Sequence, residues 1–218
     1  MDDRGDLQGC RERFHMGRMG LIFSILVWGF LHSIFASLQF KAFARRLLGP
    51  GVERFYRLGY NLFAGLSLLA VLALAAFTAD SNLYNVPLPW SVFMIAGEFL
   101  AGMTLVVGFL HSHPLEFLGL SQLGSPIEER GKLTTTGLYR YVRYPLYTAG
   151  LLLIWLAPRM TVNLLVTDLA LTAYLLIGAN LEERKLRTEF GQEYVDYMAA
   201  TPMFVPFLRG NKSRRGTS

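Results

Sequence analysis

Two runs of 22 residues, Met19 to Phe40 and Leu58 to Ala79, contain no Asp, Glu, Lys or Arg. A helix that crosses a lipid bilayer needs roughly 20 predominantly apolar residues, and each of these runs meets that length. The chain of 218 residues is also 52% hydrophobic overall. These runs therefore constrain the fold to a membrane-embedded helical protein before any other feature is considered.

Three more apolar segments follow, at Trp90 to His111, Tyr144 to Pro158 and Met160 to Leu181. The middle one is short, because 15 residues of helix span about 22 Å against a hydrocarbon core of roughly 30 Å. We expect it to begin in the interface region and to form a tight hairpin with the last segment around Pro158 and Arg159. The sequence thus predicts an all-α, polytopic membrane protein with about five transmembrane helices.

The basic residues follow the predicted topology. Of 21 Lys and Arg residues, sixteen fall on the side that holds the segments after the first, third and fifth helices, and five fall on the other side. By the positive-inside rule the larger group is cytoplasmic, so the N-terminus faces out and the C-terminus faces in. The formal net charge of +5 is thereby explained by topology, and we expect no nucleic-acid partner.

The polar segments outside the apolar runs indicate how the chain is organised into tails and a transmembrane domain. The outer loop from Asp80 to Pro89 is short and without a basic residue, which excludes a large extracellular domain. We expect residues 1–18 to form a polar tail, 19–206 a single transmembrane domain, and 207–218 a basic disordered tail near anionic membrane lipids. The one cysteine, Cys10, offers neither a disulfide framework nor a cysteine metal cluster. The oligomeric state is not readable from the sequence.

An amphipathic helix is predicted after the fifth apolar segment. Leu186, Phe190, Tyr194 and Tyr197 recur at spacings of four, four and three residues, with charged residues on the other faces. Such a helix either lies in the membrane interface with its aromatic rings at headgroup level or closes over a site. The sequence leaves both alternatives open.

The most informative segment runs from Gly137 to Tyr147 and holds two arginines and four tyrosines just before the short apolar helix. Pro145 suits the first position of that helix. The helix would then direct unpaired N–H groups and the positive end of its dipole toward the cytoplasm beside Arg143, and such a place attracts an anion. A belt of arginine and tyrosine at the membrane interface is the competing interpretation.

Two carboxylates, Glu182 and Glu183, lie near the cytoplasmic end of the fifth helix. In a tight hairpin the start of the fourth helix and the end of the fifth are neighbours. Arg143 therefore faces one of these glutamates, either across a shared pocket or in a plain ion pair.

These residues together resemble a known family. The resemblance covers roughly residues 133–206 and rests on Gly137, Tyr139, Arg143, Pro145, Tyr147, Glu182, Glu183, Leu186, Phe190, Gly191, Tyr194, Tyr197 and Pro206. They are similar to the paired C-terminal motif of the membrane methyltransferases that include isoprenylcysteine carboxyl methyltransferase and phospholipid methyltransferases. Segments around His32, Arg54 to Asn61 and Phe117 to Gln122 look most like the bacterial branch that contains methanethiol S-methyltransferase.

The resemblance implies an enzyme that uses S-adenosyl-L-methionine to methylate a small thiol, or a lipid-borne carboxyl or amine group, at the cytoplasmic membrane face. It implies that Arg143 binds the cofactor carboxylate and Glu182 or Glu183 its ammonium or ribose. Tyr139, Tyr144 and Tyr147 would enclose the sulfonium and the adenine. Gly137 and Pro145 complete the implied cofactor site, Arg143 and Glu183 are the implied catalytic pair, and no metal is required.

One position departs from the family pattern, because Tyr144 stands where the family usually has histidine. Tyrosine keeps an aromatic face and a hydrogen-bonding group but does not titrate near neutrality. A non-catalytic accessory protein with a degenerate pocket is therefore one alternative. The other is an NADPH-dependent sterol-type reductase, but its motif usually continues from the tyrosine into Gly-Asp, whereas this chain reads Thr148-Ala149-Gly150.

Ionisable residues inside predicted membrane helices are the remaining candidates for function. Glu98 and Asp168 lie inside predicted helices, and His32 lies in the cytoplasmic half of the first. His32 is expected to hydrogen-bond between helices. His111 and His113 have alternating spacing but no convincing partners, so the sequence predicts no metal site.

Overall fold

The computed structural model describes residues 3–49, 51–111 and 133–206. The helices in these ranges are α1 (Asp3–Ala36), α2 (Leu38–Leu48), α3 (Val52–Phe77), α4 (Trp90–His111), α6 (Pro145–Trp155), α7 (Val162–Phe190) and α8 (Gln192–Ala200). The short elements are the 3-10 helix η2 (Gly137–Arg140) and the strands β1 (Asn82–Asn85) and β2 (Arg159–Thr161). Among the described residues, four helices are long and apolar enough to cross a membrane, and α6 is a shorter apolar helix. The all-α, polytopic fold class is confirmed.

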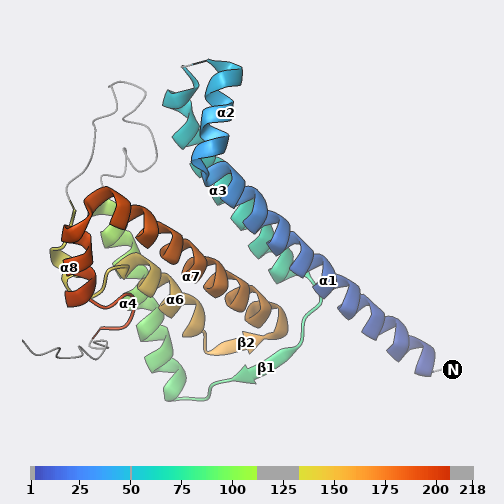
Figure 1. Ribbon diagram of the computed structural model, residues 1–218. Helices are drawn as coiled ribbons and strands as arrows, with labels where there is room; N and C mark the ends of the chain where they lie inside the picture. Colours follow the sequence, from blue (N-terminus) through green and yellow to red (C-terminus); the bar gives the residue numbers. More distant parts are fainter. Residues whose placement is uncertain (1–2, 50, 112–132, 207–218) are drawn as a thin grey trace, which may run out of the picture.

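The N-terminal half is a pair of long helices, α1 and α3, joined by the short helix α2 (Figure 1). The predicted uncharged run continued to Phe40, but the helix is interrupted at Ser37. The Ser37 hydroxyl accepts the backbone N–H of Phe40 at 3.2 Å and so caps a new helix. Residues 3–18, expected as a separate polar tail, are helical and continuous with the first membrane-spanning segment.

The two halves are joined by backbone pairing at the end opposite α2 and α8 (Figure 1). β1 and β2 pair antiparallel, with Asn82 opposite Thr161. Asp80 Oδ1 accepts the backbone N–H of Asn163 at 3.0 Å, and the Thr161 hydroxyl caps α7 by accepting the N–H of Leu164 at 3.2 Å. The sequence did not indicate this strand pairing.

The buried core lies where α1 and α3 contact α7. Leu21, Ile25, Trp28 and Val71 form its centre, packed against partly buried apolar residues of α3 and α7. Elsewhere many large apolar side chains of α1, α3 and α4 are exposed. In a soluble protein such a surface would be a liability, whereas in a membrane protein it is the lipid-facing surface.

The α4 and α6 helices pack closely because α4 carries glycine at the contact. A β-carbon at Gly97 would lie 2.6 Å from Leu156 Cδ1, and one at Gly108 would collide with Leu146. Small residues at such contacts let membrane helices approach each other, since apolar side chains gain little by leaving lipid. Gly97 and Gly108 thus set the position of α6, which carries part of the candidate site.

Three predicted segments lie outside the described residues. They are the basic tail 207–218, the family-like segment Phe117 to Gln122, and His113.

We predict that Gly97→Val and Gly108→Val each destabilise the protein by about 1 kcal/mol, the low end of the usual penalty of overpacking, because the nearest atoms are leucine methyl groups that must turn aside. Gly102→Val is the matched control, because it lies in the same helix and a β-carbon there meets nothing within 4 Å. Thermal unfolding in detergent micelles measures the difference. Equal melting temperatures for all three variants would show that α4 and α6 are not closely packed.

Candidate active site

The C-terminal helix pair is built differently from the single amphipathic helix that the spacing predicted. The α7 helix continues well past Leu181 to Phe190, and α8 is a separate helix that begins at Gln192. Gly191 separates them with a φ of 58°, a left-handed conformation in which a β-carbon is strained. The predicted apolar face is therefore split between two helices, and it faces a cavity.

A cavity of about 500 Å³ lies among η2, the start of α6, the end of α7 and α8. Its walls come from Leu133, Thr134, Tyr139, Arg143, Tyr144, Pro145, Leu146, Tyr147, Glu182, Leu186, Glu189, Phe190, Tyr194 and Tyr197. Six of the eight sequence-predicted site residues belong to this set. The other two, Gly137 and Glu183, do not line the cavity.

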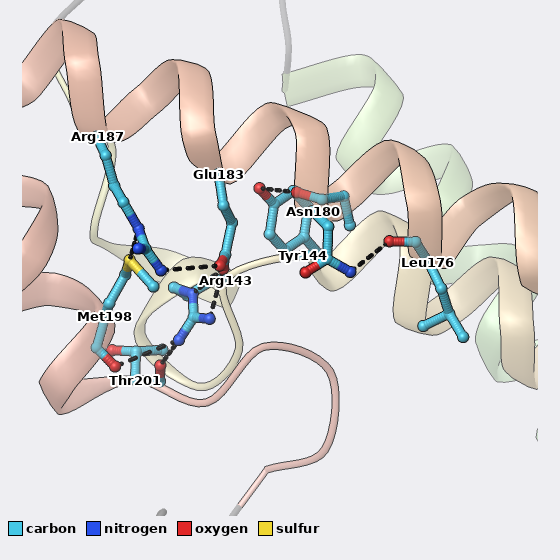
Figure 2. A network of polar contacts seen from close by, with 9 residues as sticks. Arg143, Tyr144, Leu176, Asn180, Glu183, Arg187, Met198 and Thr201 are labelled. Atoms are coloured by element: carbon cyan, nitrogen blue, oxygen red, sulfur yellow. Dashed lines mark hydrogen bonds and ion pairs between the residues drawn. The ribbon is translucent and has the colours of Figure 1, made fainter.

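Arg143 is the centre of the polar network behind the cavity (Figure 2). Its Nε donates to Glu183 Oε1 at 2.8 Å, and its Nη2 forms an ion pair with the same oxygen. Both side chains are largely buried, at 9% and 8% exposure. Of the two arrangements that the sequence left open, the structure has the direct ion pair between Arg143 and Glu183.

The same guanidinium holds the segment that follows α8. Nη1 of Arg143 donates to the carbonyl oxygens of Thr201 at 2.5 Å and Met198 at 3.3 Å. The backbone N–H of Arg143 donates to Pro202 O at 2.9 Å, and that of Tyr144 donates to Met203 O at 3.1 Å. The entrance of α6 is thus partly covered by the chain's own C-terminal segment.

Pro145 is the first residue of α6, as predicted. Tyr144, immediately before it, is buried and links the start of α6 to α7. Its hydroxyl donates to Ala179 O on α7 at 3.2 Å, and its ring stacks on Tyr147 with centroids 5.3 Å apart. Burial raises the pKa of the Tyr144 hydroxyl far above the neutral range. Tyr144 therefore keeps the aromatic surface of the family histidine but exchanges no proton near neutrality.

The predicted convergence of α6 and α7 is present. The Tyr147 hydroxyl donates to Glu182 Oε2 at 3.4 Å. This contact joins the first turn of α6 to the end of α7 at the cavity wall. The two neighbouring glutamates thus differ, because Glu182 faces the cavity and Glu183 faces Arg143.

The other tyrosines of the cavity also remain protonated at neutral pH. Burial raises the pKa of Tyr139, of Tyr194 and of Tyr197, the last to about 12. The Tyr197 hydroxyl donates to Tyr139 O at 2.6 Å and ties α8 to η2. The buried Tyr194 hydroxyl makes no hydrogen bond of good geometry within the described residues. The cavity therefore offers aromatic surface, hydroxyl groups and the carboxylates of Glu182 and Glu189.

Two kinds of contributor to the site give no clear signal in the sequence. Glu189 is one of the charged residues expected on the other faces of the amphipathic helix, because its helical position alone does not reveal which neighbour it meets. Thr201, Pro202 and Met203 contribute through backbone carbonyls, for which the residue type carries no signal. Composition and residue spacing therefore give no indication of these backbone carbonyl contacts.

Known proteins with similar sequences indicate the class of enzyme to which this chain belongs. The chain, a polytopic helical membrane protein with a cavity at the end of α7, is similar in sequence to relatives that are named methyltransferases. The methanethiol S-methyltransferase of Crocosphaera subtropica is 34% identical over 197 residues, which are 86% of this chain and 73% of that protein. The enzyme of the same name from Pseudomonas deceptionensis is 31% identical over 195 residues, 86% of this chain and 72% of that protein.

The chain belongs to the methanethiol S-methyltransferase family of membrane methyltransferases, enzymes that transfer methyl groups. No family model matches the chain, and no solved structure matches it. The resemblance inferred from the C-terminal motif is confirmed at the level of this family.

We predict that Glu183→Gln destabilises the protein by about 3–5 kcal/mol, because it leaves the buried Arg143 guanidinium without a counter-charge. Arg187→Gln is the control on the same helix: Arg187 is 53% exposed and 3.9 Å from Glu183, so its loss changes stability by at most about 1 kcal/mol. Thermal unfolding in detergent micelles compares the two variants. Equal effects would show that the Arg143–Glu183 pair is solvated rather than buried.

Proposed function

We propose that the protein transfers a methyl group from S-adenosyl-L-methionine to a small thiol at the cytoplasmic face of the membrane. The observation that carries the proposal is the cavity between α6, α7 and α8, in a chain whose relatives are named methanethiol S-methyltransferases. The cavity volume of about 500 Å³ lies within the usual range for a small-molecule site, roughly 300–1,000 Å³.

The wall of the cavity fits the cofactor in charge and in shape. A sulfonium and an ammonium are cations, and the wall supplies two carboxylates, Glu182 and Glu189, together with aromatic rings. Arg143 is a cation of the wall, but its charge is matched by Glu183.

Four groups of this chain would hold the cofactor. Glu182 would bind the ammonium or the ribose, and Tyr147 would orient that carboxylate through their hydrogen bond. Tyr139 and Tyr197 would face the adenine and the sulfonium, since both line the cavity. When bound, the cofactor supplies an electrophilic methyl group, and the protein must align the acceptor and exclude water.

Arg143 and Glu183 have a positioning role in this proposal. Both were implied as catalytic residues by the family resemblance, but the guanidinium is bonded to Glu183, Thr201 and Met198. Their ion pair fixes α7 and the segment after α8 relative to the entrance of α6. It therefore sets the shape of the cavity rather than contacting the reacting atoms.

The distribution of basic residues supports the proposed cytoplasmic placement. The residues that line the cavity come from η2, the start of α6, the end of α7 and α8. The end of α7 and α8 lie at the same end of the molecule as α2, opposite the β1–β2 pair (Figure 1). This end carries Lys41, Arg45 and Arg46 on α2 and Arg184, Lys185 and Arg187 on α7. The positive-inside rule assigns that end to the cytoplasm, from which a charged cofactor would enter. The same rule puts the C-terminus inside, and the resemblance to a bacterial branch of the family supports a bacterial inner membrane as the location.

We predict that the detergent-purified protein binds S-adenosylhomocysteine in isothermal titration calorimetry and that Glu182→Gln raises Kd about tenfold or more. A hydrogen bond to a charged group contributes about 1.5–3 kcal/mol, which corresponds to that change. Glu193→Gln is the matched control, because Glu193 is exposed on α8 and does not line the cavity.

A screen of methanethiol, a prenylcysteine and phosphatidylethanolamine as methyl acceptors then tests the substrate class. The proposal expects transfer to methanethiol alone. No binding of S-adenosylhomocysteine would favour an accessory protein, and tight binding of NADPH would favour a reductase. Transfer to the prenylcysteine or the phospholipid instead would move the substrate class from thiols to lipid-borne groups.

A further inference from the structure

The cavity wall combines charged and hydroxyl groups with apolar side chains. Glu182 and Glu189 come from α7, whereas Leu146 comes from the first turn of α6. Leu146 directly precedes Tyr147, whose hydroxyl donates to Glu182 at 3.4 Å. An apolar part of the wall therefore lies next to the residue that orients the carboxylate proposed to bind the cofactor.

The same leucine packs on α4 with its branched end. A β-carbon at Gly108 would collide with Leu146 Cδ2 and would lie 3.3 Å from its Cγ and 3.7 Å from its Cδ1. The branched end of Leu146 therefore occupies the space that glycine leaves open. Gly108 itself does not line the cavity, so Leu146 is a side chain that stands between α4 and the cavity.

The α4 helix is the membrane side of this part of the wall. It is one of the helices long and apolar enough to cross a membrane. Val106, Val107 and Leu110, on the turns around Gly108, are exposed, and in a membrane protein such side chains face lipid. An uncharged thiol dissolved in the bilayer would approach the cavity from this side, whereas a charged cofactor needs the carboxylates of α7.

We propose that the alkyl group of the methyl acceptor packs against Leu146, and that Gly108 sets the size of this acceptor by deciding where the Leu146 side chain lies. The inference rests on the proposed function and deepens it, because it names the residues that select the thiol. Leu146 is then a specificity-determining residue. Gly108 is a positioning residue that acts through Leu146.

The effect of Gly108 is transmitted by close packing. Packed helices leave few voids, so a carbon atom added at one position displaces its neighbour. A side chain at position 108 would make the branched end of Leu146 turn aside, and the cavity that Leu146 lines is open volume into which it can turn. A larger residue at position 108 therefore makes the acceptor site smaller, and a smaller residue at position 146 makes it larger.

A second glycine of α4 makes the same kind of contact away from the cavity. A β-carbon at Gly97 would lie 2.6 Å from Leu156 Cδ1 and 3.8 Å from its Cγ. Neither Gly97 nor Leu156 lines the cavity. Gly97 is therefore the matched control for Gly108, because its substitution disturbs the same pair of helices without reaching the proposed site.

The kinetic test uses methanethiol, ethanethiol and 1-butanethiol, which differ in length but hardly in acidity. Room for one methylene in an apolar pocket changes kcat/KM by about 10-fold to 200-fold. Leu146→Ala should therefore raise kcat/KM for butanethiol relative to methanethiol by about tenfold or more. Gly108→Ala should lower kcat/KM for ethanethiol relative to methanethiol by about tenfold, and Gly97→Ala should leave both ratios unchanged.

A double variant shows whether Gly108 acts through Leu146. Leu146→Ala removes the atoms with which a β-carbon at position 108 collides. Adding Gly108→Ala to it should therefore change the ratios no further, and such non-additivity is expected for two residues in contact. If Gly108→Ala alone does not fold, the double variant should fold. A double variant that also fails to fold would overturn the inference, because position 108 would then act on something other than Leu146.

A binding measurement without turnover shows which ligand Leu146 faces. In isothermal titration calorimetry with S-adenosylhomocysteine, Leu146→Ala should keep the Kd of the wild type. Glu182→Gln is the reference for a change on the cofactor side of the cavity. The loss of the leucine side chain is thus expected to change the preference among thiols and not the affinity for the cofactor product.

Three further outcomes overturn the inference. The first is an equal shift of the thiol ratios in Gly108→Ala and Gly97→Ala, which would show that Leu146 does not turn into the cavity. The second is a Leu146→Ala variant with the thiol preference of the wild type. The third is a Leu146→Ala variant that binds S-adenosylhomocysteine as weakly as Glu182→Gln, because Leu146 would then contact the cofactor. Failure of the proposed function is distinguishable, because it appears as a wild type that methylates no thiol at all.

Discussion

A single buried guanidinium joins three parts of the chain that are far apart in sequence. Arg143 stands at the entrance of α6 and bonds to Glu183 on α7 and to the carbonyls of Met198 and Thr201 around the end of α8. A buried charge is tolerated only when it is fully paired, so these contacts fix one another. The rest of the candidate site depends on them, because the position of α8 decides where Tyr194 and Tyr197 form a wall.

The cavity and the core between α1, α3 and α7 are different environments. The cavity at the basic end is walled by carboxylates and tyrosines, which suits a charged ligand from water. Between α1, α3 and α7, the rings of Trp28, His32, Tyr60 and Tyr174 pack against one another and hold the three helices together. The glycines of α4 let α6 pack closely against it.

Much of the fold and of the candidate site could be predicted from local sequence. The predictions that were wrong also have local causes. Apolar run length located the membrane helices, and Pro145 located the start of α6, because both depend on composition and on a fixed backbone angle. Spacing failed at Gly191, where a regular apolar period crosses a left-handed glycine and two helices were taken for one. It also missed the break at Ser37, since a capping hydroxyl inside an uncharged run does not alter hydropathy. Tyr144 was noted as a departure from the family histidine, but its role as a buried link to Ala179 needed the packed structure.

The sequence by itself determined the number and approximate position of the apolar helices, the side that carries the basic residues, and the motif that places the chain among membrane methyltransferases. These properties depend on residues that are neighbours in the sequence. The partitioning of a helix into a bilayer depends on the same local composition. Only the tertiary structure decided which of two adjacent glutamates faces the cavity and which pairs with Arg143. It also decided that β1 pairs with β2 and that rings from α1, α3 and α7 meet. Those outcomes depend on contacts between residues tens of positions apart, whose geometry is set by helix packing and not by any local pattern.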